Sequence, residues 1–139
     1  MLSKLPGGKV IFSKMVGTMA PYTGTIRPRV VELKEGYAKV TMRDRKKIRN
    51  HLKSIHAIAL INLGEVTTGL ALLYGLPDDA RGIAIGLSIE YFKKARGTLT
   101  AECTCAHITS NQEADYELEG NIYDQENDKV ARVIAKWKI

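Results

Sequence analysis

The stretch NHLKSIHAIALINLGE, residues 50–65, decides the fold of this chain. A polar, basic loop leads directly into an apolar run, and Ser54 stands where the N-cap of a helix is expected. The apolar run ends at Gly75, a residue type that commonly terminates helices. We therefore predict one long helix over residues 54–74, buried nearly all round, with His56 in its first turn.

Alternating apolar and polar residues lie on both sides of this helix and predict strands. Two runs precede the helix and are expected to form a hairpin through Gly36, and Pro28 in the first run predicts an edge strand or a bulge. Four more runs follow the helix, and their short connections predict antiparallel pairing with one apolar face. The expected strands cover residues 25–34, 37–43, 81–92, 98–107, 114–124 and 129–139.

These elements predict an α+β fold in a single domain over residues 1–139, in which a curved antiparallel sheet wraps around one long central helix. A short helix is expected within the N-terminal extension, residues 1–21. A single sheet leaves part of an apolar helix uncovered and leaves two strand edges open. We therefore expect the chain to associate with itself, as a homodimer or a homotetramer.

The composition predicts a folded chain with basic surfaces. Hydrophobic residues make up 45% of the sequence, and the net charge is +6. A positive balance favours a partner that carries phosphates. Nucleic acid is not expected, because the basic segments lack interleaved aromatic residues and no helix-turn-helix, RNP or zinc pattern is present.

Cysteine and histidine usage predicts neither a disulfide nor a metal site. Cys103 and Cys105 are two residues apart in a strand-like run, so they share a face and are expected to be core residues in a reducing cytoplasm. No pair of histidines or acids has metal-ligand spacing. The apolar helix carries Glu65 in its middle, which argues against a membrane span.

Glu65 is the strongest functional candidate, because a carboxylate in an apolar helix is costly unless it is used. Unpaired N–H groups at the start of the same helix, near Ala57, could stabilise a developing oxyanion. The two positions are separated by a rise of about 12 Å along one helix. If both act on one carbonyl, Glu65 must come from a second subunit. The alternative is a structural Glu65 that Thr68, Asn62 or a water satisfies.

The pattern Asn50-x5-His56-Ala57-Ile58-x6-Glu65 resembles the hotdog-fold superfamily, and most of all its PaaI-like acyl-CoA thioesterase branch and nearby uncharacterised hotdog domains. The resemblance covers residues 22–139. Family members typically show an Asn, then His-Gly-Gly, then an acid at the same spacing. This chain departs from the pattern, because Ala57-Ile58 replaces the two glycines.

The resemblance implies a role for each matching residue in thioester hydrolysis. The backbone N–H of Ala57 would bind the thioester carbonyl, and Glu65 from the neighbouring subunit would act as general base or nucleophile. Asn50 would help to orient the attack, and Thr68 matches a hydroxyl residue that often accompanies the acid. The substrate would be an acyl-CoA or another acyl thioester, with coenzyme A bound only as part of the substrate.

Four cations are candidates to bind the phosphates of coenzyme A, and the alternative is that they are solvated surface charges. They are Arg49 in the basic loop and Lys93, Lys94 and Arg96 after the third strand.

Two further functions remain open. One is a non-catalytic hotdog protein that binds acyl groups or lipid, which the missing glycines favour. The other is a hydroxyacyl-thioester dehydratase in which His56 is the base, although a positioning role for His56 is the stronger interpretation.

Overall fold

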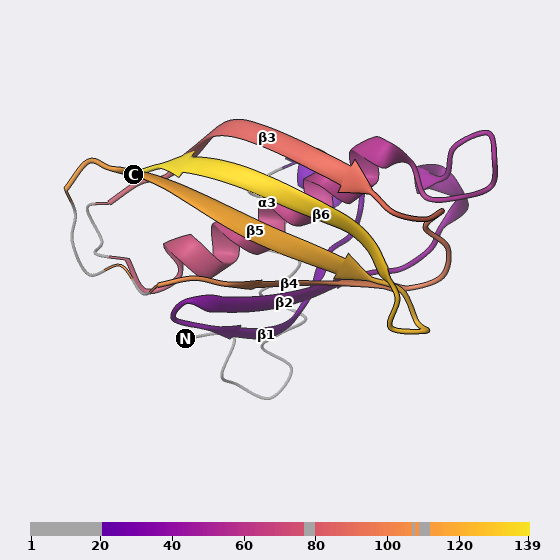
Figure 1. Ribbon diagram of the computed structural model, residues 1–139, viewed down its shortest axis with the longest axis horizontal. Helices are drawn as coiled ribbons and strands as arrows, with labels where there is room; N and C mark the ends of the chain where they lie inside the picture. The colour runs from indigo at the N-terminus through magenta and orange to yellow at the C-terminus, as the bar shows by residue number, and fades with distance from the viewer. Residues whose placement is uncertain (1–20, 77–79, 107, 109–111) are drawn as a thin grey trace.

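The structure is a computed structural model that describes residues 21–76, 80–106, 108 and 112–139 (Figure 1). The helix predicted within residues 1–21 therefore lies outside the described residues except at Pro21, where the short helix α2 begins. The elements in chain order are α2 (Pro21–Gly24), β1 (Arg29–Lys34), β2 (Tyr37–Met42), η2 (Lys46–Ile48), α3 (Ala57–Leu73), β3 (Ile83–Tyr91), β4 (Leu99–Thr104), β5 (Asp115–Tyr123) and β6 (Lys129–Lys138).

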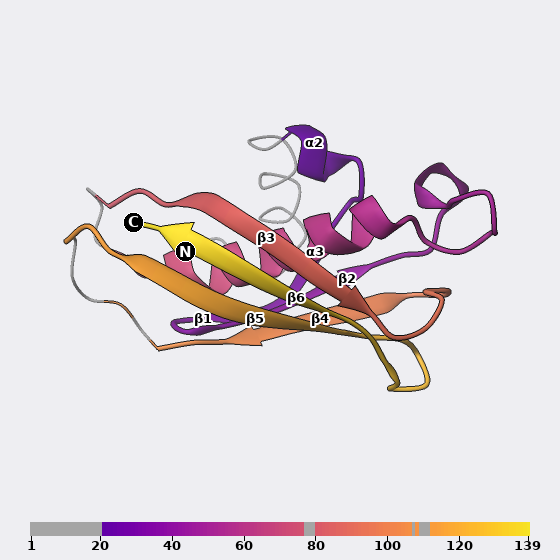
Figure 2. The ribbon, with the colours of Figure 1, turned by 45° about the horizontal axis from the view of Figure 1, so that its top comes forward.

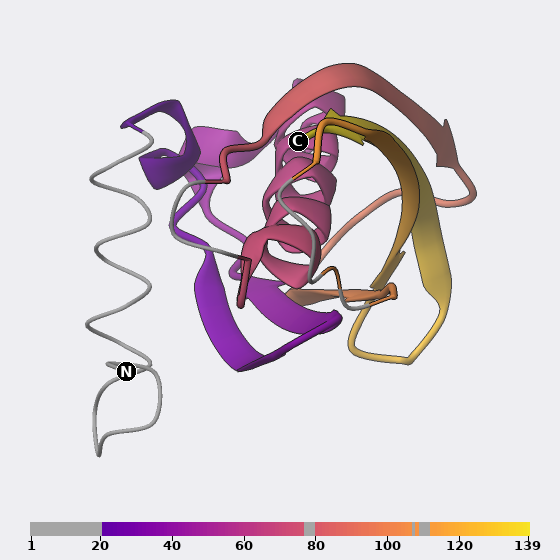
Figure 3. The same ribbon diagram turned by 90° about the vertical axis from the view of Figure 1, so that its left-hand side faces the viewer.

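All six strands form one antiparallel sheet in the order β1-β2-β4-β5-β6-β3. The sheet curves around α3 (Figures 1 and 2), and the view along the molecule shows α3 enclosed by that curve with α2 on its open side (Figure 3). This is the predicted architecture, although each strand is shorter than its sequence pattern suggested. No helix among the described residues is long and apolar enough to span a membrane.

The two outer strands of the sheet differ in character. β1 begins directly after Pro28, and its pairing with β2 shifts register between Val30 and Glu32, as expected for an edge strand with a bulge. β3 is the other edge and exposes large apolar side chains, so its surface is unusually hydrophobic for an open edge. The exposed fractions are 64% for Ile83, 48% for Ile85, 40% for Leu87 and 47% for Tyr91.

The helix starts three residues later than predicted, because Ser54 is not its N-cap. The N-cap is His56, whose Nδ1 accepts a hydrogen bond from the Ile58 N–H at 3.0 Å. The N–H of Ile55 instead donates to Ala95 O at 2.8 Å, and the N–H of His56 donates to Ile48 O at 2.8 Å. These long-range bonds hold residues 55–56 in an extended conformation and delay the first helical turn.

Small residues let α3 lie directly on the sheet. A Cβ on Gly64 would lie 2.3 Å from Val133 of β6, and a Cβ on Gly69 would lie 2.8 Å from Trp137. Backbone and sheet therefore approach more closely than any larger residue allows. This contact fixes the rotation of the helix and decides which of its residues face away from the sheet.

Candidate functional site

The first turn of α3 offers one free backbone donor. The Ile58 N–H is bonded to the His56 ring, and the Ala59 N–H donates to His56 O at 3.0 Å. For the Ala57 N–H, the described residues supply no acceptor. A free N–H at a helix N-terminus, where the helix dipole is positive, favours an anion or a developing oxyanion.

A cavity of about 360 Å³ opens beside this donor. Asn50 and Ala57 line it from the loop and the helix start, and Tyr91, Lys93 and Lys94 line it from the end of β3 and the following loop. The structure thus brings together four of the residues that the sequence suggested, which come from segments about 40 residues apart.

Tyr91 is a site residue that the sequence did not reveal. Its hydroxyl donates to the Ala57 carbonyl oxygen at 3.1 Å, which ties the edge strand to the helix start. Burial raises the pKa of Tyr91, so the hydroxyl stays protonated and remains a donor. The alternation of β3 places Tyr91 on the same side as Ile89, but only the hydrogen bond to Ala57 shows that its side chain reaches the helix start.

Asn50 builds the loop that precedes the helix. Its Oδ1 accepts from the backbone N–H groups of Leu52, at 2.9 Å, and Ser54, at 3.2 Å. The Asn50 N–H also donates to Ser54 O at 2.7 Å, so the loop closes on itself. The Nδ2 group has no acceptor among the described residues and remains available to a ligand of the cavity.

Glu65 lies half-buried in the middle of α3 and does not line the Ala57 cavity. Its Oε1 accepts from Asn62 Nδ2 at 3.1 Å, and the same amide donates to Thr23 of α2 at 3.2 Å. Of the structural partners considered for the carboxylate, the structure thus shows Asn62. Within one chain, Glu65 and the Ala57 donor remain separated by the rise of about 12 Å.

Thr68 packs against the sheet. It is fully buried, its hydroxyl donates to Gly64 O at 2.9 Å, and the same oxygen accepts from Trp137 Nε1 at 3.1 Å. A second contact reaches the backbone oxygen of Glu65, not its carboxylate. The geometry therefore gives Thr68 a role in joining α3 to β6.

Replacing Thr68 with valine is expected to lower the free energy of unfolding by about 1–3 kcal/mol, because it leaves the buried Trp137 N–H without an acceptor. Urea unfolding followed by tryptophan fluorescence measures this. Thr68→Ser keeps the hydroxyl and serves as the matched control. An unfolding free energy of the valine variant equal to that of wild type would show that the Trp137 bond contributes nothing.

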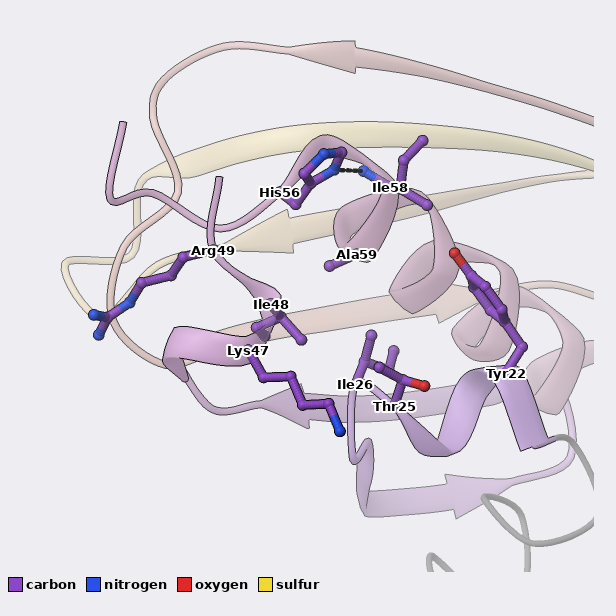
Figure 4. Close-up of a pocket in the computed structure, with 9 residues that line it drawn as sticks. All are labelled: Tyr22, Thr25, Ile26, Lys47, Ile48, Arg49, His56, Ile58 and Ala59. Carbon is purple, nitrogen blue, oxygen red and sulfur yellow. Dashed lines mark hydrogen bonds between the residues drawn. The ribbon is translucent and has the colours of Figure 1, made fainter. Parts of the chain in front are cut away.

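His56 borders a second cavity, of about 300 Å³, between α2, η2 and the start of α3 (Figure 4). Its walls are mainly apolar, with Lys47 and Arg49 among the lining residues. Since Nδ1 of His56 accepts from the Ile58 N–H, the neutral ring carries its proton on Nε2. Neither ring nitrogen then has a free lone pair, so the arrangement suits capping of the helix and not base catalysis.

Two of the four candidate phosphate-binding cations are already paired. Lys93 contacts Asp124 at 2.7 Å and Asp128 at 3.0 Å, and hydrogen bonds from these acids raise the pKa of Lys93. Arg49 is bonded to Asp44 at 2.7 Å. Two cations form no salt bridge with any described residue and are the freer candidates. They are Lys94 and Arg96.

The cysteines are both free, as their spacing predicted. Burial raises the pKa of the Cys103 thiol to about 12, so it is not a thiolate nucleophile at neutral pH. Across the described part of the chain, no three His, Cys, Asp or Glu residues are grouped to hold a metal ion.

Comparison with known proteins identifies a family for this chain and solved structures that share its fold. The profile of a family described as a domain of unknown function, DUF4442, matches residues 8–139. Among curated proteins, none matches the chain.

Solved structures show the same fold over nearly the whole chain. A structural-genomics protein is 32% identical, with a TM-score of 0.82, over 98% of this chain and 90% of that one. A Pseudomonas aeruginosa protein described as a probable thioesterase is 21% identical, with a TM-score of 0.81, over 96% and 95%. A mutant of a Staphylococcus aureus thioesterase is 14% identical, with a TM-score of 0.75, over 84% and 96%. The hotdog fold is thereby confirmed.

Proposed function

Because the chain belongs to the DUF4442 family and shares the hotdog fold with proteins described as thioesterases, we propose that it hydrolyses acyl-CoA thioesters. The observation that carries the proposal is the free Ala57 N–H at the start of α3, in a cavity that Asn50 and Lys94 also line. Hydrolysis of a thioester passes through a tetrahedral oxyanion, and a fixed donor aimed at that oxygen lowers the barrier.

The reaction assigns one task to each group. The Ala57 N–H binds the carbonyl oxygen as it becomes negative, and the Nδ2 of Asn50 is placed to orient the substrate or the attacking water. Glu65 takes a proton from water, which attacks the carbonyl carbon, and the thiolate of coenzyme A leaves. The products are a carboxylic acid and free coenzyme A.

The site is completed across a two-fold dimer in this proposal. Glu65 is about 12 Å from Ala57 along one helix, so it must serve the Ala57 cavity of the partner. The apolar edge of β3 supports such a dimer, because an exposed hydrophobic strand edge is a natural surface for a second copy. Tyr91 lies on that edge and also contacts Ala57, so the edge and the helix start are physically connected.

The positive charges near the cavity favour coenzyme A as the carrier of the acyl group. Lys94 is exposed at the mouth of the cavity and has no anionic partner among the described residues, and Arg96 lies two positions further along. Their positive charges complement the phosphates of coenzyme A. Lys93 and Arg49 contribute less in this proposal, since aspartates already neutralise them.

A non-catalytic acyl-binding protein is the second candidate, and one observation favours it. Ile58, where the resembled pattern has glycine, is 50% exposed beside the helix start. A side chain of that size narrows the approach of a thioester to the Ala57 donor.

Wild-type protein assayed on acetyl-, hexanoyl-, phenylacetyl- and palmitoyl-CoA tests the proposal through the release of free thiol. We expect turnover of at least one substrate, and a residual turnover at least about a hundredfold lower by an identically purified Glu65→Gln variant, which controls for contaminating hydrolases. Tight binding of an acyl-CoA by calorimetry without any turnover would favour the acyl-binding protein. Absence of both would contradict the two functions together.

A further inference from the structure

Asn62 is a buried amide in the middle of the apolar helix, one turn before Glu65. Only 5% of its surface is exposed. Its Nδ2 donates to Glu65 Oε1 at 3.1 Å and to Thr23 Oγ1 at 3.2 Å. One NH₂ group thus joins the candidate catalytic acid to α2, a helix that lies 39 residues earlier in the chain.

We propose that Asn62 is a positioning residue that holds the Glu65 carboxylate in the orientation needed for proton transfer, with Thr23 fixing the amide from the other side. The inference rests on the proposed function, in which Glu65 is the base. Asn62 itself touches neither substrate nor the reacting atoms in this scheme and acts through Glu65.

The hydrogen-bonding pattern separates this role from simple packing. The Oδ1 of Asn62 is buried and has no donor among the described residues, whereas both amide hydrogens have acceptors. The reverse orientation of the amide would place Oδ1 against the carboxylate oxygen of Glu65, two acceptors facing each other. In the observed orientation Nδ2 therefore donates to the Glu65 carboxylate, and Oδ1 is left without a donor among the described residues.

Thr23 gives the amide its second anchor. It is also buried, with 5% of its surface exposed, and it belongs to α2 on the open side of the sheet (Figure 3). A half-buried glutamate on one helix has several rotamers, and a single hydrogen bond from a freely rotating amide would not select one of them. An amide held at both hydrogens selects one, and this is how a site gains a fixed geometry.

A double-mutant cycle in the thioesterase assay tests the inference. Asn62→Leu, whose side chain is branched at the same atom but cannot donate a hydrogen bond, is expected to lower kcat about tenfold to a hundredfold with little change in KM, as misplacement of a catalytic group does. In the Glu65→Gln background the same change is expected to have no further effect on kcat. If Asn62 acts only on stability, Asn62→Leu would lower kcat by the same factor in the wild-type and the Glu65→Gln backgrounds. That result would overturn the inference.

Thr67→Val is the matched control, since Thr67 is a fully buried residue on the same helix whose hydroxyl, among the described residues, bonds only Leu63 O. Its kcat should stay near that of wild type. If Asn62→Leu does not fold, Thr23→Val takes its place, with a fall in kcat of a few-fold that vanishes in the Glu65→Gln background. An unchanged kcat in Thr23→Val would then overturn the inference.

Different results would show that the proposed function is wrong and that the role of Asn62 is wrong. If Glu65→Gln hydrolyses as wild type does, Glu65 is not the base, whatever Asn62 does. If wild type hydrolyses nothing, the side-chain amide resonances of Asn62 still report the contact by NMR. They should shift in Glu65→Gln and not in Thr67→Val, and unshifted resonances would show that Asn62 does not hold the carboxylate.

Discussion

Replacing Ala57 with proline is expected to lower kcat for thioester hydrolysis about 10²–10³-fold, which is the typical loss for one oxyanion donor. Proline removes the backbone N–H and leaves the rest of the site in place. No other substitution at this position deletes the proposed donor itself, because the donor belongs to the main chain.

The fold should tolerate this change for a local reason. Ala57 is the first residue of α3, the position at which proline is most favoured in helices because its missing N–H has no intrahelical partner. The preceding residue, His56, has φ −62° and ψ 141°, which is the extended conformation that a following proline requires. Circular dichroism and the melting temperature should therefore match those of wild type.

Ala57→Gly is the control for the proline variant. It keeps the N–H and restores the glycine of the resembled pattern, so its kcat should equal or exceed that of wild type. A proline variant that folds and hydrolyses as wild type does would exclude the Ala57 N–H as the oxyanion donor.

Replacing Glu65 with glutamine is expected to lower kcat about 10²–10⁴-fold, the range that general acid–base groups contribute. Glutamine keeps the size of the side chain and can still bond to Asn62, but it cannot accept a proton at neutral pH. Steady-state kinetics on the best acyl-CoA substrate measures the loss. Glu113→Gln removes an exposed carboxylate outside the site and should hydrolyse as wild type does.

Mixing the two inactive variants tests whether one site draws on two chains. In a hybrid dimer, one of the two sites combines the intact Ala57 of the Glu65→Gln chain with the intact Glu65 of the Ala57→Pro chain. Random reassortment after mild unfolding should restore about a quarter of wild-type activity. No recovery, from hybrids shown to form by mass spectrometry, would place both groups in the same chain's site.

The strands and the long helix were predictable because their patterns are local. Alternation with a period of two and a continuous apolar run bounded by Gly75 need no knowledge of distant residues. The edge position of β1 also followed from Pro28, since proline cannot donate to a neighbouring strand. The open edge at β3 carries no such mark, and only the order of the strands reveals it.

The sequence predicted several residues of the candidate site, but it predicted their arrangement in space less well. Asn50, Ala57 and Lys94 do share a cavity, but Thr68 of the same pattern faces the sheet. The spacing of Thr68 from Glu65 put both near one helix face, and the close contact of α3 with β6 then decided which of the two is buried. Pairing of Lys93 with Asp124 depends on a loop that lies 31 positions further along.

By itself, the sequence determined most of the secondary structure, the sheet curved around one long helix and the acid in that helix, since these depend on periodicity and on the cost of burying charge. The hotdog fold was expected from the resemblance of the motif around Asn50, His56 and Glu65. The tertiary structure decided that the helix begins at Ala57, because the N–H groups of Ile55 and His56 bond to Ala95 O and Ile48 O and hold these two residues in an extended conformation. That displacement of three residues from Ser54 leaves the Ala57 N–H as the free donor. Hydrogen bonds between segments far apart in the chain, which no local pattern encodes, thus placed the candidate site.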